Sequence, residues 1–286
     1  MAGVAVVTDS TASLASAVAA RARVTVVPLQ VVIDEVSRPE SADGVTPAVV
    51  ASALRRGSSV TTSRPAPEAF AAVYADLAAE GYREIVSVHL SRLMSGTYAA
   101  AVAAAETAAV PVTVVDSRTL AMATGFAVLS GAAAAAGGAD GTEIADVVQR
   151  RAEAAQMYFY VETLDHLRRG GRIGSAAALL GSALSVKPVL TVTAGQIRSC
   201  ERVRTSSRAL ARLEELAVAA LTQAGTPTGR VDLAVHHLDR GSAAEALAER
   251  LDRRVPGRSA VSITEVSAVL AAHVGPGTLG VVVSPR

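Results

Sequence analysis

The stretch "EIVSVHLSRLMSGTYAAAVAAAETAAVPVTVVD", residues 84–116, is typical of a strand–helix–strand unit. Residues 84–90 and 112–116 are short β-branched runs, and such runs predict buried strands. The alanine-rich segment between them predicts a helix that begins just after Ser95. Two strands joined by a crossover helix run parallel in one sheet, so this stretch predicts an α/β fold.

The same rhythm occurs nearer the N-terminus, where residues 4–9 ("VAVVTD") and 24–34 ("VTVVPLQVVID") are also predicted as strands. We expect Ser10 and Thr11 to cap the helix after the first strand. "Thr-Pro" at 46–47 fits a cap followed by proline at the first helical position. A βαβα rhythm predicts a parallel sheet covered by helices.

The second half of the chain has a different pattern. Residues 157–162 ("MYFYVE") are predicted as a strand, and residues 185–204 as a hairpin with its turn at Ala194-Gly195. Two short helices hinged at Gly170-Gly171 precede the hairpin, and a helix over about 205–224 follows it. We therefore expect two α/β domains with a ligand between them. Residues 1–155 would form the N-terminal domain with a parallel sheet flanked by helices, and residues 156–286 a C-terminal α+β domain.

Composition argues against several classes of partner. Lys and Arg (27) nearly balance Asp and Glu (26) without long runs of one sign, which disfavours nucleic acid or an anionic membrane surface. The single cysteine, Cys200, cannot form an internal disulfide or a thiolate metal site, and a free thiol suits a reducing compartment. The N-terminus has no basic flank before its apolar run, unlike a secretory signal, and no apolar stretch is long enough for membrane insertion. We expect a cytoplasmic protein that uses no metal and no cofactor.

Familiar catalytic motifs are missing from the sequence. It contains no G-x-S-x-G elbow, no phosphate-binding P-loop, no G-x-G-x-x-G after the first strand and no H-E-x-x-H. Hydroxyls, glycines and one histidine instead follow the predicted strands, and these residue types donate hydrogen bonds to an oxyanion. The candidates are Asp9, Ser10, Thr62, Ser63, Ser95, Gly96, Thr97 and His273.

Ser95 has three chemically reasonable roles. It can cap its own helix, or it can form part of an anion site, because the first turn of a helix leaves backbone N–H groups unpaired at a partly positive end. Gly96 would let a ligand approach the backbone closely, and Thr97 adds a hydroxyl. The third role is that of a nucleophile.

Taken together, the motifs resemble the DegV family in order and spacing. The matching segments extend from Val6 to Val283 and include "VVTDSTASL", "TTSRPAP", "LSRLMSGTY", "VVDSRTLAMATG", "LDHLRRGGRIGSAAALLGSALSVKPVLTVTAGQI", "ERVR" and "HVGPGTLG". The resemblance implies a long-chain fatty acid held between two α/β domains. It also implies that the chain is no enzyme but the lipid-binding subunit of a two-component fatty acid kinase, which presents the carboxylate to a separate ATP-using kinase and carries the acyl phosphate toward phospholipid synthesis.

The resemblance assigns roles to particular residues. Thr62, Ser95 and His273 would anchor the carboxylate, with backbone N–H groups near Ser95 and Gly96 assisting. Asp9, Ser10, Ser63 and Thr97 would lie close to the ligand, and Arg172, Arg202 and Arg204 are candidates for docking the kinase. Two residues differ from the motifs that are common in the family. Arg64 stands in "TSRP", where "TSQP" is common, and Arg92 replaces a small polar residue.

Two other functions compete with this interpretation. In a lipid-ester hydrolase, Ser95 would be the nucleophile and His273 the base, with Asp9 or Asp116 orienting the histidine. In an interaction protein, the basic "RRGGRI" and "ERVR" surface would dock a partner and the pocket would be vestigial.

Overall fold

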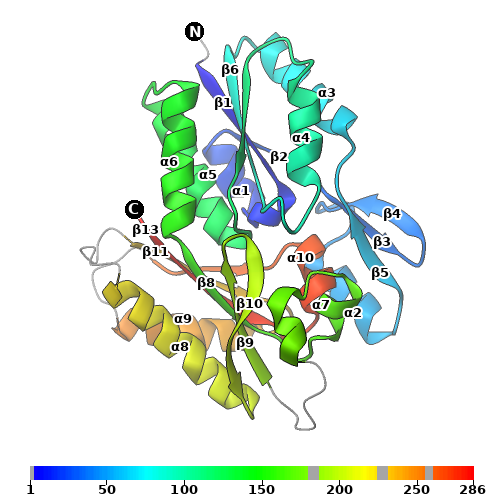
Figure 1. Cartoon of the computed structure of the whole chain (residues 1–286), viewed down its shortest axis with the longest axis vertical. Helices are drawn as coiled ribbons and strands as arrows, with labels where there is room; N and C mark the ends of the chain where they lie inside the picture. Colours follow the sequence, from blue (N-terminus) through cyan, green and yellow to red (C-terminus); the bar gives the residue numbers. More distant parts are fainter. Residues whose placement is uncertain (1–2, 180–186, 224–230, 255–259) are drawn as a thin grey trace.

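The structure, a computed structural model, describes residues 3–179, 187–223, 231–254 and 260–286. Within these ranges the strands form a four-stranded, a three-stranded and a six-stranded sheet. Figure 1 shows the four-stranded sheet in the upper half of the view, the six-stranded sheet in the lower half and the small sheet at the right. The fold is therefore mixed α/β, as the sequence predicts.

The four-stranded sheet is entirely parallel, with strand order β2-β1-β6-β7. Its strands are β1 (Val4–Asp9), β2 (Val24–Val27), β6 (Glu84–His89) and β7 (Val112–Asp116). The helix α4 (Thr97–Ala105) connects β6 to β7, which confirms the predicted strand–helix–strand unit.

Helices cover both faces of this sheet. Helix α3 (Pro67–Ala79) and helix α4 bury Phe70, Tyr74 and several alanines against one face. The opposite face packs against α1 (Ser16–Arg21), α5 (Ala121–Ala136) and α6 (Gly141–Ala154). Both interfaces are built mostly from Ala and Val, and the buried rings, Phe70 and Tyr74, lie in the first of them.

The prediction of one strand over residues 24–34 was wrong. The chain leaves the parallel sheet after Val27 and forms β3 (Gln30–Ile33), which pairs antiparallel with β4 (Val36–Pro39) and β5 (Val60–Ser63). Pro28 has no N–H to donate to a strand ladder, and the Leu29 N–H instead donates to Ser10 Oγ at 3.1 Å. The continuous β-branched run thus conceals a change of sheet.

The six-stranded sheet has order β10-β9-β8-β13-β11-β12, and every pair except β11 with β12 is antiparallel. Its strands are β8 (Gln156–Tyr160), β9 (Lys187–Thr193), β10 (Gln196–Val203), β11 (Val231–His237), β12 (Ser262–Glu265) and β13 (Leu279–Pro285). Strands β9 and β10 are the predicted hairpin. Among the residues that the structure describes, no sheet combines strands from both sides of residue 155, but the two-domain division at that residue stays a prediction.

Helices cover this sheet too. Helices α8 (Ser206–Gln223) and α9 (Gly241–Arg254) cover one face, and α8 confirms the helix predicted over 205–224. The other face packs against α7 (Asp165–Arg169), the short 3-10 helix η2 (Gly174–Leu179) and α10 (Ala268–Val274). Helices α7 and η2 flank the predicted hinge at Gly170-Gly171. The end of that predicted segment, 180–184, and the first two residues of the predicted hairpin, 185–186, lie outside the described residues.

Helix α5 joins the two large sheets. Its first residues, from Ala121 to Ala123, belong to the apolar core beneath the six-stranded sheet, whereas Ala127 and Val128 belong to the core of the parallel sheet. The Met122 N–H also donates to Nε2 of His236 on β11, at 3.2 Å. Helix α5 is therefore buried in both cores. It holds the parallel sheet, at its β7 edge, against one face of the six-stranded sheet.

One of the two predicted helix caps described above is confirmed, and the other is wrong. Thr46 caps α2 (Pro47–Arg55), with Pro47 in the first turn as predicted. The expectation for Ser10 and Thr11 was wrong: Asp9 caps a short 3-10 turn, η1 (Ser10–Ala12), and α1 begins after Ala15 without a side-chain cap. The carboxylate of Asp9 is the stronger acceptor and takes that position.

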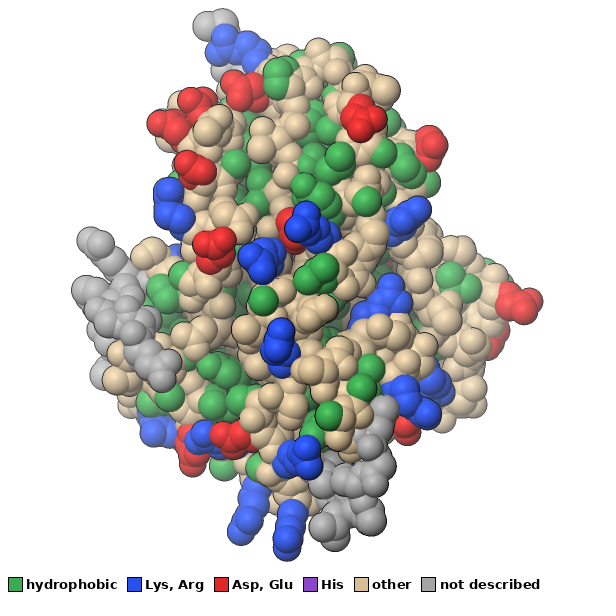
Figure 2. All heavy atoms as spheres, in the orientation of Figure 1, with side chains coloured by type: hydrophobic (Ala, Val, Ile, Leu, Met, Phe, Trp, Pro, Cys, Tyr) green, Lys and Arg blue, Asp and Glu red, His purple; other side chains and the backbone are tan. Residues whose placement is uncertain are grey.

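The visible surface carries charges of both signs. Figure 2 shows Lys and Arg interspersed with Asp and Glu over this face, rather than separated into fields of one sign. In the ranges that the structure covers, no helix is both long and apolar enough to cross a bilayer. No trio of His, Cys, Asp or Glu there is placed to hold a metal ion.

Candidate functional site

A cavity lies where the parallel sheet, the small sheet and the six-stranded sheet meet. It encloses about 820 Å³ of space between atoms, part of which is open to solvent. The side chains on opposite walls lie close together, so the cavity is narrow. Its walls come from both halves of the chain and are mostly aliphatic. They include Leu29, Leu90, Met94, Leu120, Met157, Phe159, Leu167, Ile197, Val266, Val269, Leu270 and Val274.

One pair of polar residues forms part of the cavity wall. Thr62 on β5 and His273 on α10 lie with Oγ1 and Nε2 2.8 Å apart. Ser63, Arg64, Ser95 and Arg172 line the same cavity. The predicted anchors Thr62, Ser95 and His273 are thus brought to one cavity from β5, the start of α4 and α10.

His273 is held as a neutral ring. Burial, together with the nearby Arg172 guanidinium, lowers the pKa of His273 to about 4, so the imidazole is uncharged near neutral pH. Its Nδ1 atom is buried and has no hydrogen-bond partner among the described residues.

Two glycines make room for two histidine rings. A methyl group on Gly170 would overlap the His273 ring, and one on Gly275 would overlap the ring of His166. The segment after α7 and the segment after α10 therefore fit together reciprocally, and only glycine leaves the required space.

Ser95 stands at the start of α4 and makes short-range contacts there. Its Oγ accepts from the Thr97 N–H at 3.3 Å and lies 2.8 Å from Thr97 Oγ1. The Arg64 side chain packs against Gly96, which occupies the cap position of α4. A methyl group on Gly96 would lie 2.5 Å from Arg64 Nη1. Ser95 thus lies one residue before the cap position, accepts from the first N–H of α4 and also lines the cavity.

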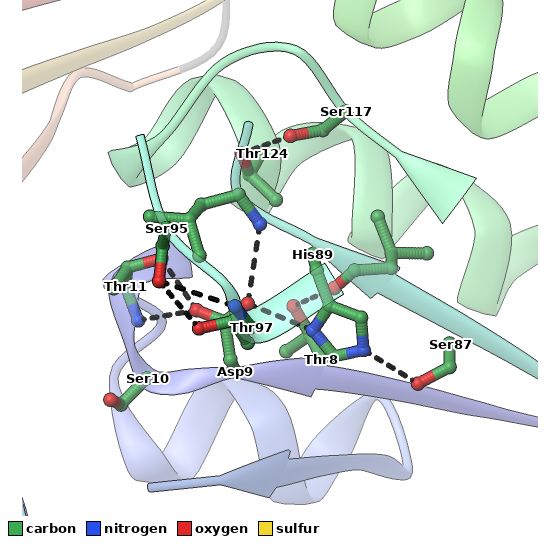
Figure 3. Close-up of polar contacts among 12 residues, drawn as sticks. Thr8, Asp9, Ser10, Thr11, Ser87, His89, Ser95, Thr97, Ser117 and Thr124 are labelled. Carbon is green, nitrogen blue, oxygen red and sulfur yellow. Dashed lines mark hydrogen bonds and ion pairs between the residues drawn. The ribbon is translucent and has the colours of Figure 1, made fainter. Parts of the chain in front are cut away.

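Asp9 belongs to a buried network rather than to the cavity wall (Figure 3). Its Oδ2 lies 2.9 Å from His89 Nδ1 and accepts from the Leu90 N–H, while Oδ1 accepts from the N–H and hydroxyl of Thr11. His89 Nε2 continues the chain to Ser87 Oγ, which accepts from the hydroxyl of Tyr74. These groups tie the ends of β1 and β6 together beneath the Ser95 loop.

The comparisons with known proteins agree with one another. The profile of the DegV family matches residues 3–286. The chain belongs to the DegV family. A DegV domain-containing protein of Streptomyces coelicolor is 50% identical over 283 residues, which cover 99% of each chain.

Two solved DegV structures share the whole fold. One, described as fatty acid binding of a DegV family protein from Thermus thermophilus, has a TM-score of 0.90 and 32% identity and covers 99% of both chains. The other, DegV from Bacillus subtilis, is described as a fatty acid binding protein. It has a TM-score of 0.89 and 31% identity, again over 99% of both chains.

The DegV motifs can now be placed in the structure. The "RRGGRI" segment brings Gly170 under His273, and Arg172 lines the cavity, where its Nε donates to the Met94 carbonyl at 3.0 Å. Arg202 and Arg204 are exposed at the end of β10, and neither lines the cavity. The three arginines therefore do not form one cluster at the cavity.

The remaining predicted ligand neighbours differ in position. Ser63 lines the cavity, but Ser10 accepts from the Leu29 N–H, and Thr97 is a buried residue at the start of α4. Ser10 and Thr97 are therefore not among the residues that line the cavity of this DegV protein.

The geometry of a serine hydrolase is not assembled. His273 contacts Thr62 and Ser95 contacts Thr97, while Asp9 holds His89 instead of His273. Asp116 accepts from the backbone N–H groups of Arg92 and Arg118 and pairs with the Arg92 guanidinium at 3.4 Å. The DegV chain lacks, among the residues described here, the nucleophile–base–acid contacts that such a mechanism needs.

Sequence reasoning missed two polar residues of the cavity wall, His236 and Thr278. His236 supports the core through its contact with Met122 and also lines the cavity. Nε2 accepts from the Met122 N–H, so a neutral ring carries its proton on Nδ1, which donates to Thr264 Oγ1 at 2.9 Å. Burial lowers the pKa of His236 to about 4. The alternation of side chains along β11 indicates that the strand has two faces, but it does not identify the face that borders the cavity.

Proposed function

We propose that this protein binds a long-chain fatty acid with its acyl chain in the cavity and its carboxylate at Thr62, Ser95 and His273. The observation that carries the proposal is the cavity itself, aliphatic over most of its wall with the Thr62–His273 pair on it. The fatty-acid-binding DegV proteins of Thermus thermophilus and Bacillus subtilis, which share the fold, support it.

Burial of the acyl chain supplies most of the affinity. A chain of about 15 methylenes would gain on the order of 12 kcal/mol at about 0.8 kcal/mol each, before the cost of association is subtracted. The thin space between the walls suits an unbranched chain, and the walls must separate as the chain enters. Hydrogen bonds to the head group, at about 1.5 to 3 kcal/mol each, then fix its orientation.

The polar residues are matched to an ionised carboxylate. Thr62 and Ser95 can each donate a hydroxyl proton, and neutral His273 can donate from Nε2 once the ligand replaces its contact with Thr62. Arg64 and Arg172 line the cavity too, so their positive charges favour the ionised acid. Gly96 lets the Arg64 side chain lie against the helix start.

We further propose that the protein is a carrier subunit and not the catalyst. It would present the carboxylate to a separate kinase, where a carboxylate oxygen attacks the γ-phosphorus of ATP and ADP leaves, giving an acyl phosphate. Exposed Arg202 and Arg204 are candidates for kinase docking, with Arg172 nearer the ligand. The free thiol of Cys200 and the kinase role both suit the cytoplasm.

Identification of the bound lipid tests the binding proposal. Solvent extracts of the purified protein, analysed by mass spectrometry, should contain about one long-chain fatty acid per chain. The delipidated protein should take up added fatty acid again. A protein that is empty and also fails to bind added fatty acid would contradict the proposal.

A separate experiment tests the docking proposal. Charge reversal in the pair Arg202→Glu and Arg204→Glu should slow phosphoryl transfer from the kinase without weakening fatty acid binding. Transfer at the wild-type rate would remove these arginines from the docking surface.

A further inference from the structure

A second cavity adjoins the first across the Thr62–His273 pair. It encloses about 700 Å³ of space between atoms, counted with the part open to solvent, and lies between the α2–β5 segment and helices α7 and α10. Thr62, Arg172 and His273 line both cavities. A carboxylate bound at these residues would therefore stand at the border between the two spaces.

The second cavity, which we call the vestibule, is lined by hydrogen-bond donors. Besides the three shared residues, its polar wall contains Ser58, Ser59, Thr61, His166 and Arg169. All of its lining residues are described by the structure, and none is Asp or Glu. The vestibule differs in this respect from the aliphatic cavity beside it.

The two arginines of the vestibule keep their positive charge available. Arg169 Nη2 lies 3.2 Å from His166 Nδ1, and Arg172 donates to the carbonyl oxygens of Met94 and Gly170. All of these acceptors are uncharged when His166 is neutral, and burial followed by the charge of Arg169 lowers the pKa of His166. The nearest acidic side chain of α7, Asp165, is paired with Arg168 at 3.3 Å.

Within the parts of the chain that the structure covers, neither Arg169 nor Arg172 forms an ion pair with a carboxylate. Two guanidinium groups without counter-charges, beside hydroxyls and imidazoles, have the chemistry of a phosphate site, because guanidinium and phosphate form strong charge-assisted hydrogen bonds.

We propose that the vestibule binds the phosphoryl group of the acyl phosphate, while the acyl chain stays in the aliphatic cavity. This inference rests on the proposed function, since it assumes that the ligand's carboxylate lies at Thr62 and His273. The ligand head takes the place of the Thr62–His273 hydrogen bond, and the group attached to the carboxylate oxygen enters the vestibule, where Arg169 and Arg172 balance its charge.

A comparison of two ligands on the same chain tests the proposal. The first is hexadecanoate, and the second is a β-ketophosphonate of matching length, in which a CH2 group replaces the bridging oxygen of the acyl phosphate so that it cannot hydrolyse. Binding of both is measured on the delipidated full chain. Arg169→Gln should weaken the ketophosphonate about tenfold, the loss expected for one charge-assisted hydrogen bond, and should weaken hexadecanoate less than about twofold.

Arg168→Gln is the matched control, because Arg168 is the neighbouring exposed arginine and does not line the vestibule. It should change neither affinity. An equal loss for both ligands in Arg169→Gln, or no loss for either, would overturn the proposal. Thermal unfolding of each variant checks that the fold is intact.

Two further outcomes separate this inference from alternatives. If wild-type protein fails to bind hexadecanoate, the proposed function itself is contradicted; if it binds hexadecanoate and Arg169→Gln spares the ketophosphonate, only the vestibule fails. Inorganic phosphate, titrated into fatty-acid-loaded protein, should show no saturable binding in the millimolar range. Tight, Arg169-dependent binding of inorganic phosphate would identify a general phosphate site and contradict the assignment to the acyl phosphate.

Discussion

Thr62 Oγ1 and His273 Nε2 lie 2.8 Å apart although 211 residues separate them along the chain. The contact joins the edge of the small sheet to the last turn of α10. It places a hydroxyl and a neutral imidazole side by side before any ligand arrives, so a carboxylate would meet donors whose positions are already set.

Replacement of Thr62 by valine tests this arrangement. Thr62→Val keeps the shape of the side chain and removes its hydroxyl, so we expect about tenfold weaker fatty acid binding and a nearly unchanged midpoint of thermal unfolding. Thr113→Val, on an exposed strand position of the parallel sheet, is the control and should bind as wild type does. Unchanged affinity in Thr62→Val would exclude this hydroxyl as a carboxylate anchor.

A methyl group at Gly170 should displace the His273 ring. Gly170→Ala is expected to lower fatty acid affinity and to reduce stability by about 1 to 3 kcal/mol, the usual cost of overpacking. In Gly241→Ala the nearest atom would be 3.9 Å away, so that variant should retain both properties. Fluorescent fatty acid titration and denaturant unfolding measure the two effects, and wild-type binding in Gly170→Ala would show that the ring is not held where we place it.

Arg64 should contribute to the preference for a charged head group. We expect Arg64→Gln to reduce the affinity ratio between a fatty acid and the alcohol of the same chain length, mainly through weaker acid binding. The guanidinium lines the cavity and packs on Gly96, and it forms no ion pair within the described ranges. Competition assays with both ligands give the ratio; an unchanged ratio would mean that Arg64 acts only through packing.

The Asp9–His89 network should matter for stability. Because both side chains are fully buried, Asp9→Ala leaves His89 and the Leu90 N–H without their acceptor and should cost about 3 to 5 kcal/mol. Asp165→Ala removes an exposed carboxylate paired with Arg168 and should cost less than about 1 kcal/mol. Chemical denaturation compares the two, and similar losses would show that the buried network adds little.

Glu40 should make stability depend on pH. Burial raises the pKa of Glu40 to about 7, against hydrogen bonds from Ser10 and the Ala268 and Val269 backbone that favour the ionised form, and Asp9 adds to the rise. The folded state therefore binds this proton more tightly than the unfolded state, in which an ordinary glutamate titrates near pH 4.5. Its contribution to stability is complete below about pH 4.5 and is lost as the pH rises through about 7.

Replacement of Glu40 by glutamine isolates that contribution. Relative to wild type, Glu40→Gln should raise the free energy of unfolding by more at about pH 8 than at about pH 5, with a difference of at most about 3 kcal/mol. Denaturant titrations at the two pH values measure it. A constant difference between variant and wild type would mean that Glu40 titrates as it does in the unfolded chain.

Local patterns in the sequence predict the elements well where one cause dominates. Alternating runs of β-branched residues and an alanine-rich helix identify β6, α4 and β7, and the glycine turn at Ala194-Gly195 identifies the β9–β10 hairpin. The same kind of pattern gives a wrong prediction for residues 24–34. There the loss of one backbone N–H at Pro28 outweighs the strand propensity of the residues around it.

The cavity depends on long-range contacts that local patterns do not contain. Ser95 and His273 could be proposed because hydroxyls and glycines follow predicted strands, but Asp9 shows the same pattern and is held instead by His89, 80 residues away. The packing of Arg64 on Gly96 likewise depends on how β5 approaches α4. The spacing of apolar residues in the sequence does not predict that approach.

The position of β13 has a consequence for biosynthesis. This last strand lies in the middle of the six-stranded sheet, between β8 and β11, whereas the parallel sheet uses only residues up to Asp116. On the ribosome the parallel sheet can form early, but β8 and β11 must wait for residues 279–285 to fill the gap between them. Gly280 on that strand also lines the cavity, so the cavity wall of a nascent chain is incomplete until residue 280 has been translated.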